Sequence, residues 1–457
     1  MAFYDYSFLF AFLPMVLAVY YLVPQRLRNL WFLAASLAFY FFADMTFLPV
    51  LLLAALVNYF LGYCLAQSQA VRTRKLWLAL GIFFNLALLC SFKYLGFFAQ
   101  TLRLLPPFAQ FHAPRAALPI GISFYTFTSM SYLVDLYRGQ VQPARSLWDF
   151  SAFLTMFPHI VSGPIVRFRE IKDQFEHRAF QFSRLTEGIA LFFMGFSKKI
   201  LLADTAGYFC DPLFSLHTPG FLSAWLSALL FSAQIYFDFS GYTDMALGLA
   251  LLLGFEYPQN FNSPYKAATF TEFWRRWHMT LSRWLRDYLY ISLGGNRQGR
   301  FRAYLNLMLT MLLGGLWHGA SWTFVAWGGY HGLLLAIERA LGLRLPPAGK
   351  AWRGLRTAFT FIMVSIGWGV FFRARDFSQS LRWIRSMLLL DGLGTMVSWK
   401  PLATLLALLV IIFGFKNSWE LRKNYRLCWT AFMIICFVMS LVIAYTKGGM
   451  PFLYARF

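Results

Sequence analysis

Charged residues are scarce in this sequence, and acidic residues are the scarcest of them. Only 13% of the 457 residues are Asp, Glu, Lys or Arg, whereas roughly a quarter are charged in a typical soluble domain. Hydrophobic residues make up 59% of the chain. This composition excludes an ordinary soluble protein and indicates an all-α, polytopic integral membrane protein, because long apolar runs cross a bilayer as helices.

Cysteine is also rare, and its spacing matches no metal-binding pattern. The five cysteines are expected to be reduced core residues, so we predict no metal site and no permanently bound cofactor. They are Cys64, Cys90, Cys210, Cys428 and Cys436. Although 41 basic residues outnumber 19 acidic ones, they are spread over short loops. This dispersal favours contact with anionic membrane lipid and argues against nucleic acid as a partner.

Long apolar runs recur along the whole chain. We predict about eleven to fourteen transmembrane or re-entrant helices, since several runs are short for a full crossing of about 30 Å. No fixed repeat or long linker divides them, so we expect one membrane-embedded domain, 1–457, with its motif core at about 118–331. The predicted segments are 7–23, 30–43, 47–66, 76–98, 121–136, 150–162, 187–202, 221–239, 243–255, two within 303–337, 357–372, 401–415 and 428–445.

The basic residues near the N-terminus predict the orientation of the first helices. Segment 7–23 lacks a preceding cation and a small-residue cleavage site, so we expect it to stay as the first helix. Arg26 and Arg28 follow it, and Arg72 and Arg74 follow the third helix. The positive-inside rule places these two loops in the cytoplasm and the N-terminus outside.

His318 lies in a stretch without a single charged residue, 303–337. An ionisable side chain in hydrocarbon costs free energy, so it is by default a candidate for function, and an imidazole suits general-base catalysis. The alternative is a structural histidine bonded to a carbonyl of a neighbouring helix, which is our expectation for His331. The stretch would be about 50 Å long as one helix, so we predict a break at Gly314-Gly315 or Gly319.

The segment 270–290 predicts one amphipathic helix with Thr271 as its N-cap. Its aromatic side carries Trp274, Trp277, Trp284 and Tyr288, and its polar side carries Arg275, Arg276, Arg283 and Arg286. The arginines either anchor the helix at the lipid interface or attract an anionic donor. His278 falls on the aromatic side, which favours a buried role.

Three polar residues, Asp238, Ser240 and Asp244, lie in a segment that otherwise resembles a membrane helix. Burying a carboxylate without a partner costs several kcal/mol. We therefore expect a structural polar cluster with arginine or tyrosine partners, or a helix break at Ser240-Gly241; substrate contact is the alternative.

Two prolines bend the segment 157–167. Proline interrupts a helix because it lacks the N–H donor. Arg167 at the end of this bend is a candidate ligand for a phosphate of a donor substrate.

Five motifs, in this order, resemble those of the membrane-bound O-acyltransferases. They are Leu-Pro-Ile-Gly-Ile-Ser-Phe at 118–124, Ser-Gly-Pro at 162–164, Tyr-Phe-Asp-Phe-Ser-Gly-Tyr at 236–242, Phe-Trp-Arg-Arg-Trp-His at 273–278 and Trp-His-Gly at 317–319. The resemblance is to the bacterial branch that acetylates alginate or adds D-alanine to teichoic acid. It implies a ring of helices around a thin centre, with funnels from both faces and His318 as the catalytic histidine. His278 would then be the second motif histidine, a catalytic residue that we predict orients or polarises the carbonyl of the acyl donor.

The predicted function is transfer of an acyl group, most simply acetyl, from a cytoplasmic thioester such as acetyl-CoA to a hydroxyl. The resemblance implies O-acetylation of a periplasmic or extracellular polysaccharide through a partner protein, at the bacterial inner membrane. The predicted donor-binding residues are Arg275, Arg276, Arg283, Trp277, Trp317 and Arg167. Two alternatives stay open: D-alanyl transfer to teichoic acid, and a transporter or flippase for lipid or glycan that performs no chemistry.

Overall fold

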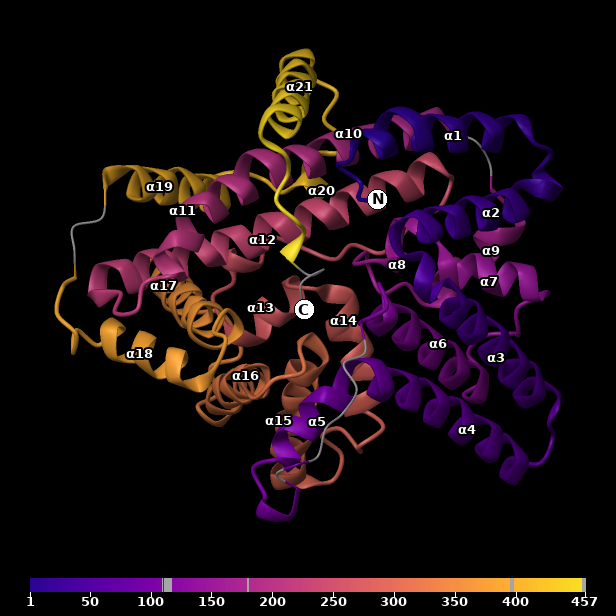
Figure 1. The fold of residues 1–457 in the computed structure, drawn as a ribbon, viewed down its shortest axis with the longest axis horizontal. Helices are drawn as coiled ribbons and strands as arrows, with labels where there is room; N and C mark the ends of the chain where they lie inside the picture. Colours follow the sequence, from indigo (N-terminus) through magenta and orange to yellow (C-terminus); the bar gives the residue numbers. More distant parts are fainter. Residues whose placement is uncertain (109, 111–116, 179–180, 395–397, 454–457) are drawn as a thin grey trace. The chain divides into compact units, whose positions relative to one another are not determined.

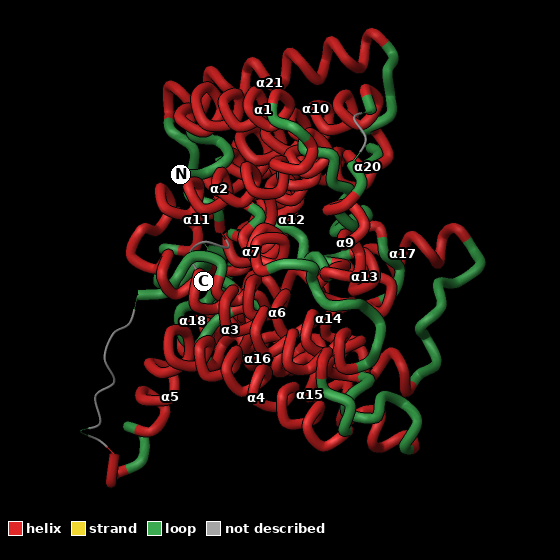
Figure 2. Tube along the Cα trace, turned by 90° about the vertical axis from the view of Figure 1, so that its right-hand side faces the viewer, coloured by secondary structure: helices red, strands yellow, loops and turns green. Residues whose placement is uncertain are grey.

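The computed structural model describes residues 1–108, 110, 117–178, 181–394 and 398–453. Every regular element in this part of the chain is helical, as Figure 2 shows. The chain forms two compact units, residues 1–192 with 245–258 and residues 193–244 with 259–457. The all-α prediction is confirmed, and the single domain 1–457 stays a prediction.

The first unit consists of the N-terminal helices, short π- or 3₁₀-helical segments, and the end of α12. Its elements are η1 (Phe8–Phe12), α1 (Leu13–Leu22), α2 (Gln25–Asp44), η2 (Met45–Phe47), α3 (Leu48–Gln67), α4 (Val71–Leu89), η3 (Cys90–Tyr94), α5 (Leu95–Leu102), η4 (Pro106–Phe108), α6 (Ile122–Tyr137), α7 (Leu147–Thr155), α8 (Phe157–Ile160), α9 (Phe168–Glu176) and most of α10 (Phe182–Ser197). Helix α7 ends at Thr155, and the short helix α8 ends at Ile160. These two interruptions agree with the predicted bends at 157–167.

The second unit carries the predicted histidines and the arginine-rich segment. Its elements are η5 (Lys198–Ala203), α11 (Asp204–Phe214), most of α12 (Gly220–Leu252), η6 (Pro264–Lys266), α13 (Phe270–Arg276), α14 (Met279–Trp284), η7 (Leu285–Tyr290), α15 (Gly299–His318), α16 (Trp322–Ala340), α17 (Lys350–Ile366), η8 (Gly367–Phe372), α18 (Phe377–Met387), α19 (Trp399–Gly414), α20 (Ser418–Leu421) and α21 (Leu427–Lys447).

Several of the described helices are long and apolar enough to cross a membrane. By length and composition they are Gln25–Gln67, Val71–Leu102, Gly220–Leu252, Lys350–Phe372 and Leu427–Thr446. Shorter apolar helices are Phe8–Leu22 and Trp399–Gly414. These segments agree with a polytopic membrane protein.

The charge-free stretch folds into the helix pair α15 and α16, which lie side by side in Figure 1. The break falls at Gly319, as predicted, since α15 ends at His318 and α16 begins at Trp322. The alternative break at Gly314-Gly315 is wrong. A Cβ on Gly315 would lie 2.2 Å from the Phe324 carbonyl oxygen, so glycine is needed there for close packing of two unbroken helices.

The predicted division of α12 into segments 221–239 and 243–255 is also wrong. The helix runs without a break from Gly220 to Leu252, about 50 Å at 1.5 Å per residue. A Cβ on Gly241 would lie 2.7 Å from the carbonyl oxygen of Gly195 in α10. The glycine therefore permits close helix packing instead of a turn.

Candidate active site

His318 is the last residue of α15, where the chain turns toward α16. Only 3% of the residue is exposed. Its ring lies against three aromatic rings, those of Trp317 and Trp327 with centroids at 5.0 Å and that of Phe372 at 5.5 Å. Packing on several sides restricts the rotation of the imidazole, which is a requirement for a group that must meet a substrate in one orientation.

His318 lines a cavity of about 210 Å³. Most of the wall is apolar, formed by residues such as Leu285, Met311 and Trp327. The polar residues of the wall are Ser282, Arg286, Tyr290, Thr310 and His318. We call this space the inner cavity; it gives the buried histidine an open side.

A second cavity, of about 480 Å³, is rich in arginine. Arg275, Arg283, Arg286, Arg339 and Arg344 line it. Among the described residues, Arg286 holds Asp287 at 2.6 Å, whereas no ion pair engages Arg275, Arg339 or Arg344. A concave surface with several cations attracts a multiply charged anion, and arginine forks suit phosphate. We call this space the arginine cavity.

The two cavities adjoin, because they share part of their walls. The shared residues are Trp274, Ser282, Arg286, Leu307 and Leu335. The arginines and His318 therefore line neighbouring spaces in the same unit.

His278 lies outside both cavities and is completely buried. Asn260 fixes its tautomer. The Asn260 Oδ1 atom accepts the backbone N–H of Thr280 at 3.1 Å, so the neighbouring Nδ1 of His278, at 3.2 Å, must be the donor. The Nε2 atom then carries a lone pair, and no described residue bonds to it. Burial lowers the pKa of His278 to about 3, which keeps the ring neutral.

The single helix predicted for 270–290 is wrong. The chain forms α13, then an extended Trp277 and a His278 with φ of +42°, then α14 and η7. A positive φ is unfavourable for a residue with a Cβ. Bonds from the N–H groups of Met279 and Thr280 to Asn260 hold the break in place. The N-cap is Thr269, which accepts from the Glu272 N–H, and not Thr271 as predicted.

The predicted donor-binding residues are only partly brought together. Arg275 and Arg283 line the arginine cavity, but Arg276 bonds to Glu272 at 2.7 Å and to the Asn262 carbonyl oxygen, and it lines neither cavity. Arg275 and Arg276 are successive residues of α13, so their side chains point about 100° apart and only one of them can face the cavity.

Two tryptophans and one arginine from the same prediction have other surroundings. Trp277 is fully buried and packs on Trp368 at 4.9 Å. The Trp317 ring lies 6.1 Å from that of His278 and 5.0 Å from that of His318. Arg167 belongs to the first unit, where it is buried and its N–H donates to Glu170 at the start of α9.

The residues Asp238, Ser240 and Asp244 do not form one cluster. Asp238 and Asp244 are six residues apart on α12, so their side chains project from the helix in directions about 120° apart. Asp238 accepts from Lys199 at 2.7 Å and from the Leu453 N–H at 2.9 Å. Asp244 accepts from Lys198 at 2.6 Å. The partners are lysines, not the arginines or tyrosines that we expected, and the Ser240 hydroxyl is buried without a hydrogen-bond partner among the described residues.

His331 lacks the bond to a carbonyl that we predicted for it. It is completely buried, and neither ring nitrogen has a hydrogen-bond partner among the described residues. Instead the ring packs against Trp327 at 4.9 Å and Trp274 at 5.2 Å. The expected bond to a carbonyl is replaced by aromatic contacts.

Sequence reasoning missed four residues that shape this site. Two of them are Arg339 and Arg344, for which a basic interval after the charge-free stretch was the available signal. Nothing in the sequence pointed to Asn260. Glu338, which ends the charge-free stretch, accepts from the N–H groups of Phe270 at 2.6 Å and Thr271 at 2.8 Å.

Glu338→Ala is expected to destabilise the protein and to weaken donor binding together. The buried N–H of Phe270 and the partly buried N–H of Thr271 would lose their acceptor, at a cost of about 1–3 kcal/mol for a fully buried group. The same helix, α13, carries Arg275. Thermal unfolding of the purified protein and the donor KM measure the two effects. Glu338→Gln keeps one acceptor oxygen and should lose less; an Ala variant with wild-type Tm and KM would contradict this role.

The chain is similar in sequence to several known proteins. Residues 32–370 match the membrane-bound O-acyltransferase family. The chain is 48% identical over 395 residues to a probable alginate O-acetylase of Azotobacter vinelandii, covering 85% of this chain and 78% of that one. It is 42% identical to a probable alginate O-acetylase of Pseudomonas putida over the whole of both chains. It is 34% identical to a peptidoglycan O-acetyltransferase of Helicobacter pylori, covering 98% and 96%.

The chain therefore belongs to the membrane-bound O-acyltransferase family, as predicted from its motifs. It is an acyltransferase and a multi-pass membrane protein. The transporter alternative receives no support from these relatives.

Proposed function

We propose that this protein transfers an acetyl group from a cytoplasmic thioester to a hydroxyl, for the O-acetylation of an exopolysaccharide of the alginate type at the bacterial inner membrane. The observation that carries the proposal is His318 on the wall of an inner cavity that adjoins an arginine cavity. The names of the alginate-acetylating relatives support the acceptor class.

The arginine cavity suits the phosphates of acetyl-CoA. Arg275, Arg339 and Arg344 can each form charge-assisted hydrogen bonds with phosphate oxygens. With the phosphates there, the thioester end of the donor would extend past Trp274 and Leu335 into the inner cavity. The apolar wall would exclude water and so protect the thioester from hydrolysis.

The inner cavity favours an acetyl group over a long acyl chain, which is larger, and over a D-alanyl group, which is charged. Its volume of about 210 Å³ is below the roughly 300–1,000 Å³ of sites for drug-sized ligands, so a short acyl group fits better than a long chain. A D-alanyl group carries an ammonium, which needs an anionic partner. The described residues of the wall include no carboxylate but do include the cation of Arg286, which argues against D-alanyl transfer.

In the proposed reaction, His318 acts as the general base. A nitrogen lone pair of the neutral imidazole accepts the proton of the acceptor hydroxyl as that oxygen attacks the thioester carbonyl carbon. A carbon–oxygen bond forms, the carbon–sulfur bond breaks, and the proton passes from His318 to the departing thiolate. A positioned base contributes about 10² to 10⁴ in rate to such a step.

His278 is proposed as a residue that orients the reactants. Since Nδ1 donates to Asn260, Nε2 can accept a hydrogen bond but cannot donate one. This tautomer is unsuited to polarising a carbonyl, and because His278 lines neither cavity it would act through a neighbouring side chain. The Trp317 ring packs near both histidines. Through this packing, His278 would help to fix the orientation of the His318 ring.

The immediate acceptor is proposed to be a hydroxyl on a periplasmic partner protein, which then acetylates the polysaccharide. An inner cavity of about 210 Å³ is small for a polymer chain. A partner can present a single hydroxyl and leave the polymer outside the membrane.

Mass spectrometry of cell-surface polysaccharide tests the proposed reaction. Cells without this protein should lose acetyl esters from one polysaccharide, and the wild-type chain should restore them. Unchanged acetyl content, or a loss of D-alanyl esters instead, would contradict the proposal.

A further inference from the structure

A separate cavity of about 400 Å³ lies in the second unit, and it shares no residue with the inner or arginine cavity. Its walls come from the end of α10 with η5, the middle of α12, the end of α19, and α21. Most lining residues are apolar, among them Leu201, Phe237, Ile412 and Phe432. We call it the lateral cavity.

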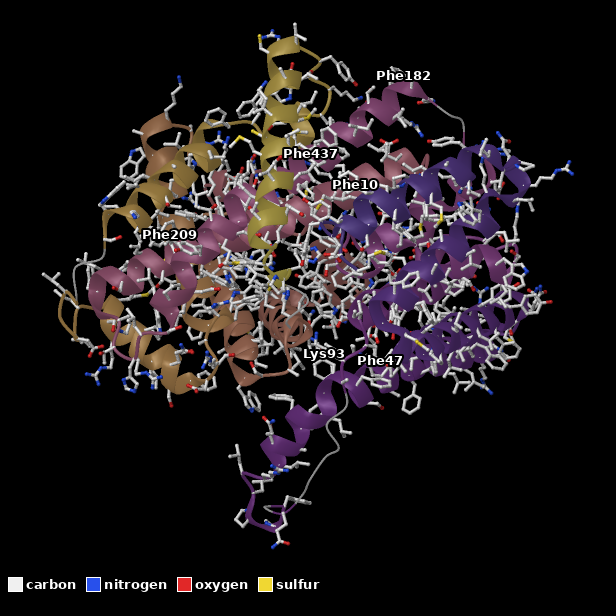
Figure 3. The ribbon with its side chains drawn as sticks, turned by 45° about the horizontal axis from the view of Figure 1, so that its top comes forward. Phe10, Phe47, Lys93, Phe182, Phe209 and Phe437 are labelled. Carbon is white, nitrogen blue, oxygen red and sulfur yellow. The ribbon has the colours of Figure 1, made fainter. Side chains whose placement is uncertain are left out.

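One wall of the lateral cavity is α21, a helix that is expected to face lipid. Phe437 on α21, labelled in Figure 3, stacks on Phe193 with ring centroids 3.8 Å apart and fixes this helix. The rest of α21 is largely exposed, with apolar side chains such as Ile435 and Val442 on its outside. Because α21 is long and apolar enough to cross a membrane, acyl chains would surround the cavity.

One end of the lateral cavity is polar and carries two ammonium groups. Lys198 donates to Asp244 at 2.6 Å and to Ser418, which leaves the third N–H of its ammonium available. Lys416 is exposed and has no ion pair among the described residues. The Ser197 hydroxyl, which also lines the cavity, is buried and has no hydrogen-bond partner in the described part of the chain.

The charge around this end favours an anion. A third ammonium, that of Lys266, bonds to the Phe415 carbonyl oxygen at 2.6 Å. The carboxylates are Asp244 and Glu420, and Glu420 already accepts the Asn417 N–H. Of these groups only Lys198 and Lys416 line the cavity, and Lys198 pairs with Asp244. Among the described residues Lys416 therefore supplies one positive charge without an ion pair, which matches a single phosphodiester.

We propose that the lateral cavity binds one anionic phospholipid, with its phosphodiester at Lys198 and Lys416 and an acyl chain between α19 and α21. The volume suits a chain better than a protein. A helix about 10–12 Å wide would fill 400 Å³ in roughly one turn, too little for a stable helix interface. The apolar wall supplies the shape, and the lysines supply the preference for an anionic headgroup.

Native mass spectrometry of the purified protein, titrated with dioleoyl phosphatidylglycerol or dioleoyl phosphatidylcholine, tests this site. The wild type should bind one phosphatidylglycerol about fivefold to tenfold more tightly than phosphatidylcholine. Lys416→Glu, an exposed change, should remove that preference. Met433→Trp, which fills the cavity from α21, should weaken binding of both lipids.

Lys400→Glu is the matched control, because Lys400 is an exposed lysine at the other end of α19. It should keep the wild-type preference. Equal binding of the two lipids by the wild type, an equal loss in Lys400→Glu, or unchanged binding in Met433→Trp would each overturn the proposal. A stoichiometric polypeptide that copurifies in place of lipid, and is lost in Met433→Trp, would overturn it as well.

Discussion

Replacement of His318 by alanine is expected to lower the rate of acetyl transfer by about 10² to 10⁴, the contribution of a positioned general base. The side chain lies at the end of α15 and lines the inner cavity, so its removal enlarges the cavity without breaking a helix. The loss should therefore appear in kcat, with little change in the KM for the donor. Transfer of radiolabelled acetyl from acetyl-CoA to the acceptor by purified protein measures both constants.

His217→Ala is the control for this experiment. His217 is an exposed histidine of the same unit and lines neither cavity, so its loss should leave both constants unchanged. Unreduced acetyl transfer by a folded His318→Ala variant would remove the general base from the proposed reaction.

Neutralisation of two arginines, Arg275→Gln with Arg339→Gln, is expected to raise the KM for acetyl-CoA roughly thirtyfold. Exposed charge pairs contribute at most about 1 kcal/mol each, and two of them give this factor. In the proposed reaction the arginine cavity holds the donor before and during transfer, so binding of the ground state and the transition state should weaken alike, with kcat nearly constant.

Salt provides a second measurement of the same effect. Ionic strength screens exposed charges, so the difference between wild type and the double variant should shrink as salt rises. Arg353→Gln, an exposed arginine on α17 outside the cavity, is the matched control and should behave as wild type. A similar KM rise in Arg353→Gln would indicate a general charge effect and not a phosphate site.

Much of the architecture could be predicted from local pattern. A charge-free stretch too long for one crossing had to break, and Gly319 was a correct choice because glycine is the residue that packs tightly or turns most easily. Gly314-Gly315 and Gly241 carry the same local signal, yet they lie inside helices. The difference is the neighbouring backbone, Phe324 for Gly315 and Gly195 for Gly241, and sequence does not show which backbone comes near.

The site was predicted only in part for the same reason. Periodicity placed Arg275 and Arg283 on a polar face, and both line the arginine cavity. The left-handed His278 and its tautomer depend on Asn260, eighteen residues earlier in the chain. Such a bond overrides local helix preference, because a buried polar group must find a partner wherever the fold provides one.

Residue order alone was enough to predict a helical membrane acyltransferase and to single out His318, because scarcity of charge and ordered motifs are properties of the linear chain. The open side of that histidine, the arginines gathered from three separate segments, and the lysine partners of the buried carboxylates required the folded protein. These features depend on which distant side chains meet, and contacts of that kind arise only when helices pack.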